Sequence, residues 1–221
     1  MLEDWETAPV SPRLRAALRL LETMTRHPQD IDRAFVASLK ADGLDTVDIE
    51  EAANVSFHFN FINRLADAFD FDLPNAEQKR KQTQMLQWMG KLIGGSRPEP
   101  SWSVGEDGLL RPMELNLARE RILTADGVTE PALRRAVEAH AARAWGGQRP
   151  ELELPEALTE YVSRLSLYAY RLTDELVEGL KESGYSEEQI FELTLAGAFG
   201  ASFVALERLF QVLHGAERQA A

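Results

Sequence analysis

Three glycine-centred segments of this chain share a pattern that marks the end of one helix and the start of the next. The three segments align without gaps: LKADGLDTVDIEEA (39–52), LTADGVTEPALRRA (123–136) and LKESGYSEEQIFEL (180–193). Each glycine is expected to take the left-handed conformation that closes a helix. A capping side chain, Asp45, Thr129 or Ser186, then starts the following helix. A chain punctuated in this way is expected to fold into helices joined by tight turns.

Two explanations of this repetition remain open. It is either the general punctuation of helix–turn–helix units or the trace of an internal duplication. A second shared landmark favours duplication, because NRLADAF (63–69) follows the first copy and ERLFQVL (207–213) follows the third, offset by three extra residues. The chain would then contain two related helical halves.

Apolar residues recur at helical spacing along nearly the whole chain, and no run shows the sustained alternation typical of a strand. Helices are predicted to begin at Ser11, Asp30, Asp45 and Asn75, and to cover about 112–125, 129–145, 155–171, 173–183 and 186–214. The Gly-, Pro- and Ser-rich stretch GGSRPEPSWSVGEDGLLRP (94–112) is typical of a linker. We therefore predict an all-α fold with an N-terminal half at 1–93, a linker at 94–111 and a C-terminal half at 112–221.

Composition excludes several classes of function. The 221 residues carry a net charge of -12, which disfavours a nucleic-acid partner. Cysteine is absent, which excludes disulfides, thiolate nucleophiles and zinc–thiolate sites. The opening MLEDWETAPV lacks the basic and apolar regions of a signal peptide, and the uncharged stretch 193–206 is shorter than the roughly 20 residues that span a bilayer. We expect a cytoplasmic protein without a membrane partner.

Two stretches resemble a known family. SLKADGLDTVDIEEAANVSFHFNFINRLADAFDFDLP (38–74) resembles the peroxidase-related branch of the alkylhydroperoxidase D and carboxymuconolactone decarboxylase superfamily, where a glycine turn leads into a helix with a phrase much like FNFINRLADAF. Residues 169–209 look like the closing helices of similar proteins. The resemblance covers about a third of the chain. It implies an alkylhydroperoxidase D-like helical fold that assembles into oligomers.

The chain departs from the family in its chemistry. The redox members use a Glu-x11-Cys-x-x-Cys-x-x-x-His arrangement, and a chain without cysteine cannot act as a thiol peroxidase of that kind. The decarboxylase members act on acidic lactones with Glu and His side chains, so the resemblance leaves non-thiol acid/base chemistry on a small acidic molecule, or its binding, as one hypothesis. The other hypothesis is a non-catalytic helical binding or assembly protein that has lost the redox site.

The polar residues of the FNFINRLADAF helix are the candidate ligand-binding group. Asn60, Asn63, Arg64 and Asp67 lie three and four residues apart, so they can share one stripe of the helix. One interpretation is a buried polar network that fixes how helices pack. The other is a pocket in which Arg64 binds a carboxylate and Asn60 orients it.

Acid/base chemistry would need a histidine and a carboxylate. The candidate catalytic residues are His58, Arg64 and Glu51, although His140 with Glu50 or Glu138 is an equally open pairing. His58 is also explained as a core or interface residue among phenylalanines. No HExxH or other metal-ligand spacing occurs, so neither a metal nor a cofactor is predicted.

Apolar residues on the same helix indicate self-association. Its large apolar side chains lie on more than one side: Phe57, Phe59, Phe61, Ile62, Leu65, Phe69 and Phe71. The last helix contains small residues at i, i+4 spacing, such as Ala196 and Gly200, that permit close packing. We predict a homo-oligomer, most simply a dimer with two-fold symmetry.

Overall fold

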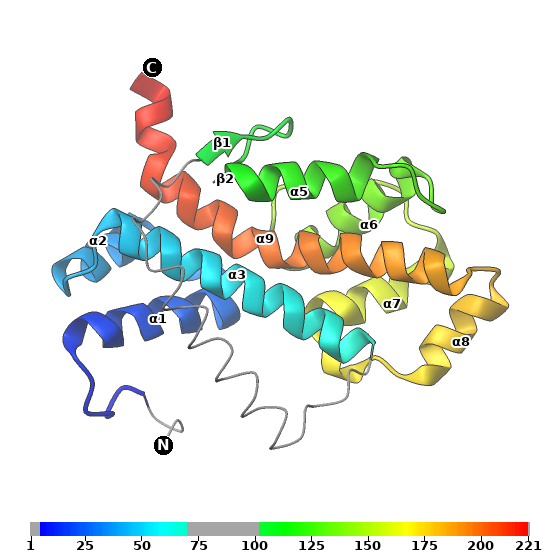
Figure 1. Ribbon diagram of the computed structural model, residues 1–221, viewed down its shortest axis with the longest axis horizontal. Helices are drawn as coiled ribbons and strands as arrows, with labels where there is room; N and C mark the ends of the chain where they lie inside the picture. The colour runs from blue at the N-terminus through cyan, green and yellow to red at the C-terminus, as the bar shows by residue number, and fades with distance from the viewer. Residues whose placement is uncertain (1–4, 70–101, 221) are drawn as a thin grey trace, which may run out of the picture.

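The computed structural model describes residues 5–69 and 102–220, with side chains to residue 215, and this part of the chain is helical apart from one small hairpin (Figure 1). The all-α prediction is confirmed. The elements in chain order are α1 (Pro12–Arg26), η1 (Pro28–Asp30), α2 (Arg33–Ala41), α3 (Thr46–Ala68), β1 (Trp102–Val104), β2 (Leu110–Pro112), α5 (Met113–Thr124), α6 (Pro131–Ala144), α7 (Glu156–Leu167), η2 (Ala169–Arg171), α8 (Asp174–Glu182) and α9 (Glu187–Ala220).

Helix α9 organises the fold, because it runs the length of the molecule and all the other layers pack around it. Figure 1 shows α3 beside it and running in the opposite direction. The second half of α9 joins a core built mainly with α1, α2 and α3, where Phe57 and Phe203 are almost wholly buried. Its first half joins a core built with α6, α7 and α8, around Tyr161 and Leu193.

The apolar character of α9 reflects this central position. Within the described residues, Glu187–Gly215 is the one segment long and apolar enough to cross a membrane by length and composition alone. However, 78% of its most apolar window is buried among the other helices, as in the core helix of a globular protein. The segment is therefore weak evidence for a membrane span, and the cytoplasmic location stays a prediction.

Three predicted caps are present, at Ser11, Asp45 and Ser186, whereas the predicted cap at Thr129 is wrong, because α6 begins after Glu130 without a side-chain cap. The Ser11 hydroxyl accepts a hydrogen bond from the Leu14 backbone N–H, with Pro12 at the first helical position. Asp45 and Asp48 form a reciprocal capping box at the start of α3. The predicted start at Asp30 is two residues early, because Asp32 caps α2 and Asp30 lies in the short helix before it. The helix predicted from Asn75 lies outside the described residues.

The glycine turns follow the prediction at two of the three copies. Gly43 and Gly184 have φ angles of 97° and 95°, the left-handed conformation that an L side chain rarely adopts. Gly127 does not, and the prediction for this copy is wrong. There the carboxylate of Glu192 lies where a Cβ of residue 127 would be, and it accepts hydrogen bonds from the backbone N–H groups of Val128 and Thr129. The middle glycine thus makes room for a side chain from α9.

The second part of the predicted linker has regular structure. Trp102–Val104 and Leu110–Pro112 pair as an antiparallel hairpin, with Ser103 opposite Arg111. Residues 94–101 of the predicted linker lie outside the described part. Strand β2 is buried, unlike a solvent-exposed linker, since Leu110 and Arg111 have no exposed surface. The hairpin therefore belongs to the packed interior, and the predicted division into halves at this point stays untested.

A buried network of charged side chains fastens the hairpin to the helices. It contains three arginines and three carboxylates from five parts of the chain: Arg111, Arg119, Arg149, Asp107, Glu138 and Glu207. The positive and negative charges are equal in number, so the network is neutral as a whole. Such balance is what allows ionised groups to be removed from water.

Two glutamates are the junctions of this network. One oxygen of Glu207 accepts hydrogen bonds from Arg111 Nε at 2.5 Å and from Arg149 Nη2 at 2.6 Å. One oxygen of Glu138 accepts from Arg119 Nε at 2.9 Å and from Arg149 Nε at 3.1 Å. Burial acts to lower the pKa of Arg149, but the charges of these two carboxylates outweigh it and raise that pKa. Arg149 therefore stays charged although its side chain is 2% exposed.

Asp107 closes the network at the hairpin turn. Its Oδ2 accepts a hydrogen bond from Arg111 Nη2 at 2.6 Å. Partial burial acts to raise the pKa of Asp107, but the hydrogen bonds and charge of Arg111, helped by Arg119 and Arg149, lower it to about 2. The carboxylate is therefore ionised at any pH at which the protein would be handled.

Replacing the shared carboxylate should destabilise the whole fold. We expect Glu207→Gln to lower the free energy of unfolding by about 3–5 kcal/mol, because Arg111 and Arg149 stay buried without the anion they share. A matched control is Glu160→Gln, which removes the carboxylate of the exposed pair with Arg164 and should change stability by less than about 1 kcal/mol. Urea unfolding measures both, and equal losses in the two variants would contradict this role of the network.

Candidate functional site

The three predicted catalytic residues lie on α3 in different surroundings. His58 and Glu51 are exposed, while Arg64 is largely covered by neighbouring helices. The Nδ1 atom of His58 is 2.7 Å from the backbone oxygen of Asn54, and since a carbonyl can only accept, this nitrogen carries the proton. The described contacts do not join His58 to Arg64. Their joint catalytic role stays a prediction.

Arg64 holds helices together. Its guanidinium donates to the backbone oxygens of Asn60 at 2.9 Å and Ser166 at 3.3 Å, and it lies over the ring of Trp145 at 5.5 Å. Burial lowers the pKa of Arg64 to about 10, against the opposing effect of Asp67. The cavity beside Arg64 measures about 10 Å³, which is room for a single water. These contacts fit the packing interpretation better than a carboxylate pocket.

The predicted ligand-binding residues divide in the same way. Asn60 is half-buried, and its amide donates to Thr25 Oγ1 at 3.2 Å and Ser56 Oγ at 3.3 Å, which ties α3 to the end of α1. Asn63 and Asp67 are exposed. The structure thus brings Asn60 and Arg64 into one packing region and leaves the other two at the surface. Whether any of them binds a ligand stays a prediction.

A buried histidine–glutamate pair was not expected from the sequence. His214 Nε2 lies 2.6 Å from Glu50 Oε1, and the ring of Trp102 stacks on the imidazole at 4.9 Å. The pair joins α3 to the last turns of α9 across 164 residues of sequence, so no local spacing could reveal it. The other open pairing differs, because His140 lies 3.3 Å from Ser163 Oγ while Glu138 belongs to the arginine network.

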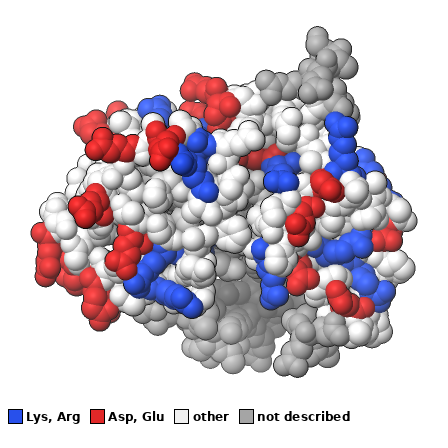
Figure 2. All heavy atoms as spheres, turned by 180° about the vertical axis from the view of Figure 1, so that it is seen from behind, with Lys and Arg blue, Asp and Glu red and all other residues white. Residues whose placement is uncertain are grey.

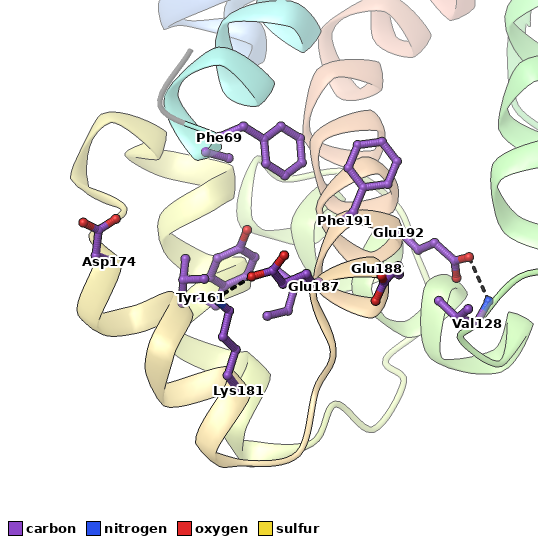
Figure 3. Close-up of a pocket in the computed structure, with 12 residues that line it drawn as sticks. Phe69, Val128, Tyr161, Asp174, Lys181, Glu187, Glu188, Phe191 and Glu192 are labelled. Atoms are coloured by element: carbon purple, nitrogen blue, oxygen red, sulfur yellow. Dashed lines mark hydrogen bonds and ion pairs between the residues drawn. The ribbon is translucent and has the colours of Figure 1, made fainter. Parts of the chain in front are cut away.

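A pocket of about 720 Å³ opens where the end of α3 meets α7, α8 and the start of α9 (Figure 3). Its apolar lining comes from all of these elements and the α5–α6 turn: Phe69, Val128, Tyr161, Val177, Ile190 and Phe191. Phe69 and Phe191 stack at 5.3 Å and form one wall, and Phe191 is 48% exposed. So large an exposed aromatic surface in a concave site is typical of a place where something binds.

The rim of this pocket is acidic. Asp174, Glu187, Glu188 and Glu192 line it together with a single described cation, Lys181. The charge of that lysine is already compensated, because its Nζ lies 2.8 Å from Glu187 and 3.0 Å from Glu178. Figure 2 shows acidic side chains gathered at the end of the molecule that α7, α8 and the start of α9 form, on the left of that view. The pocket mouth therefore lies in a negative potential.

The pKa values of two pocket residues, Glu192 and Tyr161, are shifted away from neutrality. Burial acts to raise the pKa of Glu192, but hydrogen bonds from Thr129 and from the backbone N–H groups of residues 128 and 129 lower it, helped by Arg134. Burial raises the pKa of Tyr161, whose hydroxyl lies 2.6 Å from Thr194 Oγ1. A carboxylate that stays ionised and a phenol that stays neutral cannot exchange protons readily at neutral pH.

The described residues do not form a metal-binding cluster. In residues 5–69 and 102–215, no three His, Asp or Glu side chains come together in a way that could hold a metal ion. The absence of a metal from the whole protein stays a prediction, because residues 70–101 are not described. What this pocket offers is an apolar surface bordered by fixed negative charges.

Comparison with known proteins does not identify a family for this chain. A scan against protein-family models and searches of curated proteins and of solved structures found no match. The resemblance to the alkylhydroperoxidase D and carboxymuconolactone decarboxylase superfamily accordingly stays a hypothesis drawn from the sequence motifs.

The different surroundings of Arg64 and His58 predict different effects of mutation. We expect Arg64→Ala to lower the free energy of unfolding by about 1–3 kcal/mol, because buried carbonyl oxygens lose their donor. His58→Ala removes an exposed ring and should change it by less than about 0.5 kcal/mol. Thermal melts of the two variants beside the parent measure this, and an Arg64→Ala melting temperature equal to that of the parent would show that the packing role is wrong.

Proposed function

We propose that this protein is a non-catalytic helical binding protein, built on a cysteine-free scaffold that resembles the alkylhydroperoxidase D and carboxymuconolactone decarboxylase superfamily. The proposed ligand is a small organic cation with an apolar body. The observation that carries the proposal is the pocket of about 720 Å³ at the α3–α7–α8–α9 end, with its aromatic wall and its carboxylate rim.

The size of the pocket supports a small molecule. Pockets of roughly 300–1,000 Å³ bury most of the surface of a drug-sized ligand, and this pocket falls in that range. The stacked rings of Phe69 and Phe191 supply apolar surface on one side. Transfer of an aliphatic or aromatic body onto that surface is favourable at roughly 25 cal/mol per Å² removed from water.

The charges support a cation. An anionic ligand would meet Glu187, Glu188 and Glu192 at the rim, with Lys181 already bound to two carboxylates. A cationic head group would meet mainly opposite charges there, and the net charge of -12 would attract it from a distance. Aromatic faces such as that of Phe191 add cation–π attraction to the same kind of ligand.

Binding is better supported than catalysis. Glu187 binds Lys181, Glu188 binds the Ser186 hydroxyl and Glu192 binds backbone N–H groups, and no histidine is among the described lining residues. The alternative that the sequence suggests, acid/base chemistry on a small acidic molecule by His58, Arg64 and Glu51, has less support. Arg64 donates hydrogen bonds to backbone oxygens of the packed helices, and the cavity beside it has no room for a substrate.

Two probes with the same tail and opposite charges test the proposed ligand class. We expect octyltrimethylammonium, below its micelle concentration, to bind in isothermal titration calorimetry, and octanesulfonate to bind this pocket at least about tenfold more weakly. Phe191→Ala should weaken binding of the cation by about tenfold, because it removes half of the stacked aromatic wall. Leu117→Ala is the matched control, since it trims an equally exposed apolar side chain on α5.

A charge variant separates electrostatic from purely apolar binding. Lys181→Ala removes the single described cation of the rim and should tighten binding of octyltrimethylammonium, while Lys40→Ala on α2 should leave it unchanged. The proposal fails if the cation does not bind, or if the sulfonate binds equally well and Phe191→Ala affects neither probe.

We also propose that the protein is a homodimer through the exposed face of α3. Val55, Phe59 and Ile62 lie at i, i+4 and i+7 of that helix and are 49%, 65% and 55% exposed. Phe59 and Ile62 are among the apolar residues from which self-association was predicted, and the other described helices leave both exposed. A two-fold contact between two such stripes would cover both apolar faces at once.

Light scattering after gel filtration tests the dimer. We expect a mass near twice the 24.8 kDa of one chain, and a mass near one chain for Phe59→Asp combined with Ile62→Asp, because charges would then be buried unpaired in the contact. A parent mass of one chain throughout a dilution of about a hundredfold would contradict the proposal.

A further inference from the structure

A second pocket, of about 610 Å³, lies along the second half of α9, whereas the ligand pocket described above lies at the start of that helix. Its walls come from η1 and the start of α2, from the hairpin turn at Leu109, from the α6–α7 loop at 145–148 and from the second half of α9. No side chain of the first pocket takes part in it. The two pockets are therefore independent sites.

The floor of the second pocket is rigid. Glu207 lies in it, and both carboxylate oxygens of Glu207 are bound by Arg149, with Arg111 on one of them. Trp145 forms a wall, and its position is fixed by a 2.7 Å hydrogen bond from Nε1 to the backbone oxygen of Ser166 and by the guanidinium of Arg64 over its ring. A ligand would meet a preformed apolar wall and a carboxylate whose charge is already neutralised.

The rim of the second pocket carries two arginines, whereas the rim of the first is mainly acidic. Arg33 and Arg208 line it, and among the described residues neither guanidinium forms an ion pair. Arg208 donates through Nε to the backbone oxygen of Ile31 at 2.9 Å, which holds the side chain across the pocket edge and leaves its terminal nitrogens available. The one acidic rim residue, Asp32, uses its carboxylate to cap α2.

Polar groups without charge complete the rim. Gln29, Gln148 and Gln211 line the pocket and are exposed, so their amides can donate to or accept from a ligand. In a chain of net charge -12, two arginines without acidic partners at the mouth of one pocket are a local exception to the prevailing charge. Guanidinium groups form paired, charge-assisted hydrogen bonds with carboxylate and phosphate oxygens.

We propose that this second pocket binds a small organic anion, a carboxylate or phosphate with an apolar body. Arg33 and Arg208 would bind the anionic group, and the body would lie against Trp145 and Val204. The protein would then hold two ligands of opposite charge at separate places on α9. This inference does not depend on the binding of a cation in the first pocket.

Three probes with one phenyl body and different charges test this site. In isothermal titration calorimetry we expect phenylphosphonate to bind most tightly, benzenesulfonate less tightly and neutral benzyl alcohol at least about tenfold more weakly than phenylphosphonate. The double variant Arg33→Gln with Arg208→Gln should weaken phenylphosphonate binding by about tenfold or more. Both arginines are exposed, but the variant loses the hydrogen bond from Arg208 to the Ile31 backbone oxygen, so a thermal melt must first show that it is folded at the temperature of the titration.

A matched pair of arginines controls for net charge. Arg121→Gln with Arg135→Gln removes the same charge from exposed positions on α5 and α6 and should change the affinity less than about twofold. Binding that is lost in the first pair and kept in the second supports the proposal. Absence of phenylphosphonate binding up to about 10 mM, or equal weakening in both pairs, overturns it. Phe191→Ala serves to separate the sites, because it alters only the first pocket.

Discussion

The carboxylate of Glu207 lies at the crossing of three parts of the chain that are distant in sequence. It binds Arg111 from the hairpin and Arg149 from the α6–α7 loop, and through Arg149 it reaches Glu138 on α6. Because opposite charges are matched within this buried group, the attraction between its members offsets the cost of removing each of them from water. The position of α9 relative to the hairpin, α5 and α6 is set here, and both pockets take one wall from α9.

The two halves of α9 line different pockets. The first half lies in one apolar core and supplies Phe191 and Glu192 to the acidic pocket. The second half lies in the other core and supplies Val204 and Arg208 to the pocket with the arginine rim. Under the two proposals, this one helix would contribute to two binding sites of opposite charge, and the buried network anchors it at Glu207 in the second site.

Local signals were sufficient to predict the helices and insufficient for the interactions that join them. Capping at Ser11, Asp45 and Ser186 and the left-handed glycines at 43 and 184 depend on neighbours a few residues away, and they were predicted correctly. The hairpin was missed, because its glycines and prolines resemble a linker and its stabilising partner for Arg111 is 96 residues away. Gly127 was misread for the same reason, since Glu192 is distant in sequence.

The candidate site shows the same limit. Asn60 and Arg64 stand out in the sequence as polar residues among phenylalanines, yet in the structure their side chains donate to backbone and hydroxyl oxygens of α3 itself, of α1 and of α7. Phe191, Lys181 and Arg208 look ordinary in the sequence. The packing of α3, α7 and α8 with α9 makes the first two pocket walls, and the packing of η1, α2 and the α6–α7 loop with α9 does the same for Arg208.

Hydrogen–deuterium exchange with and without octyltrimethylammonium tests the central claim, that the acidic pocket is a binding site. The account predicts slower exchange in α8 and in the first turns of α9, residues 174–192, with the second half of α9 unchanged. Exchange that is unaffected by the cation, or slowed only at residues 28–33 and 145–148 around the second pocket, would contradict it.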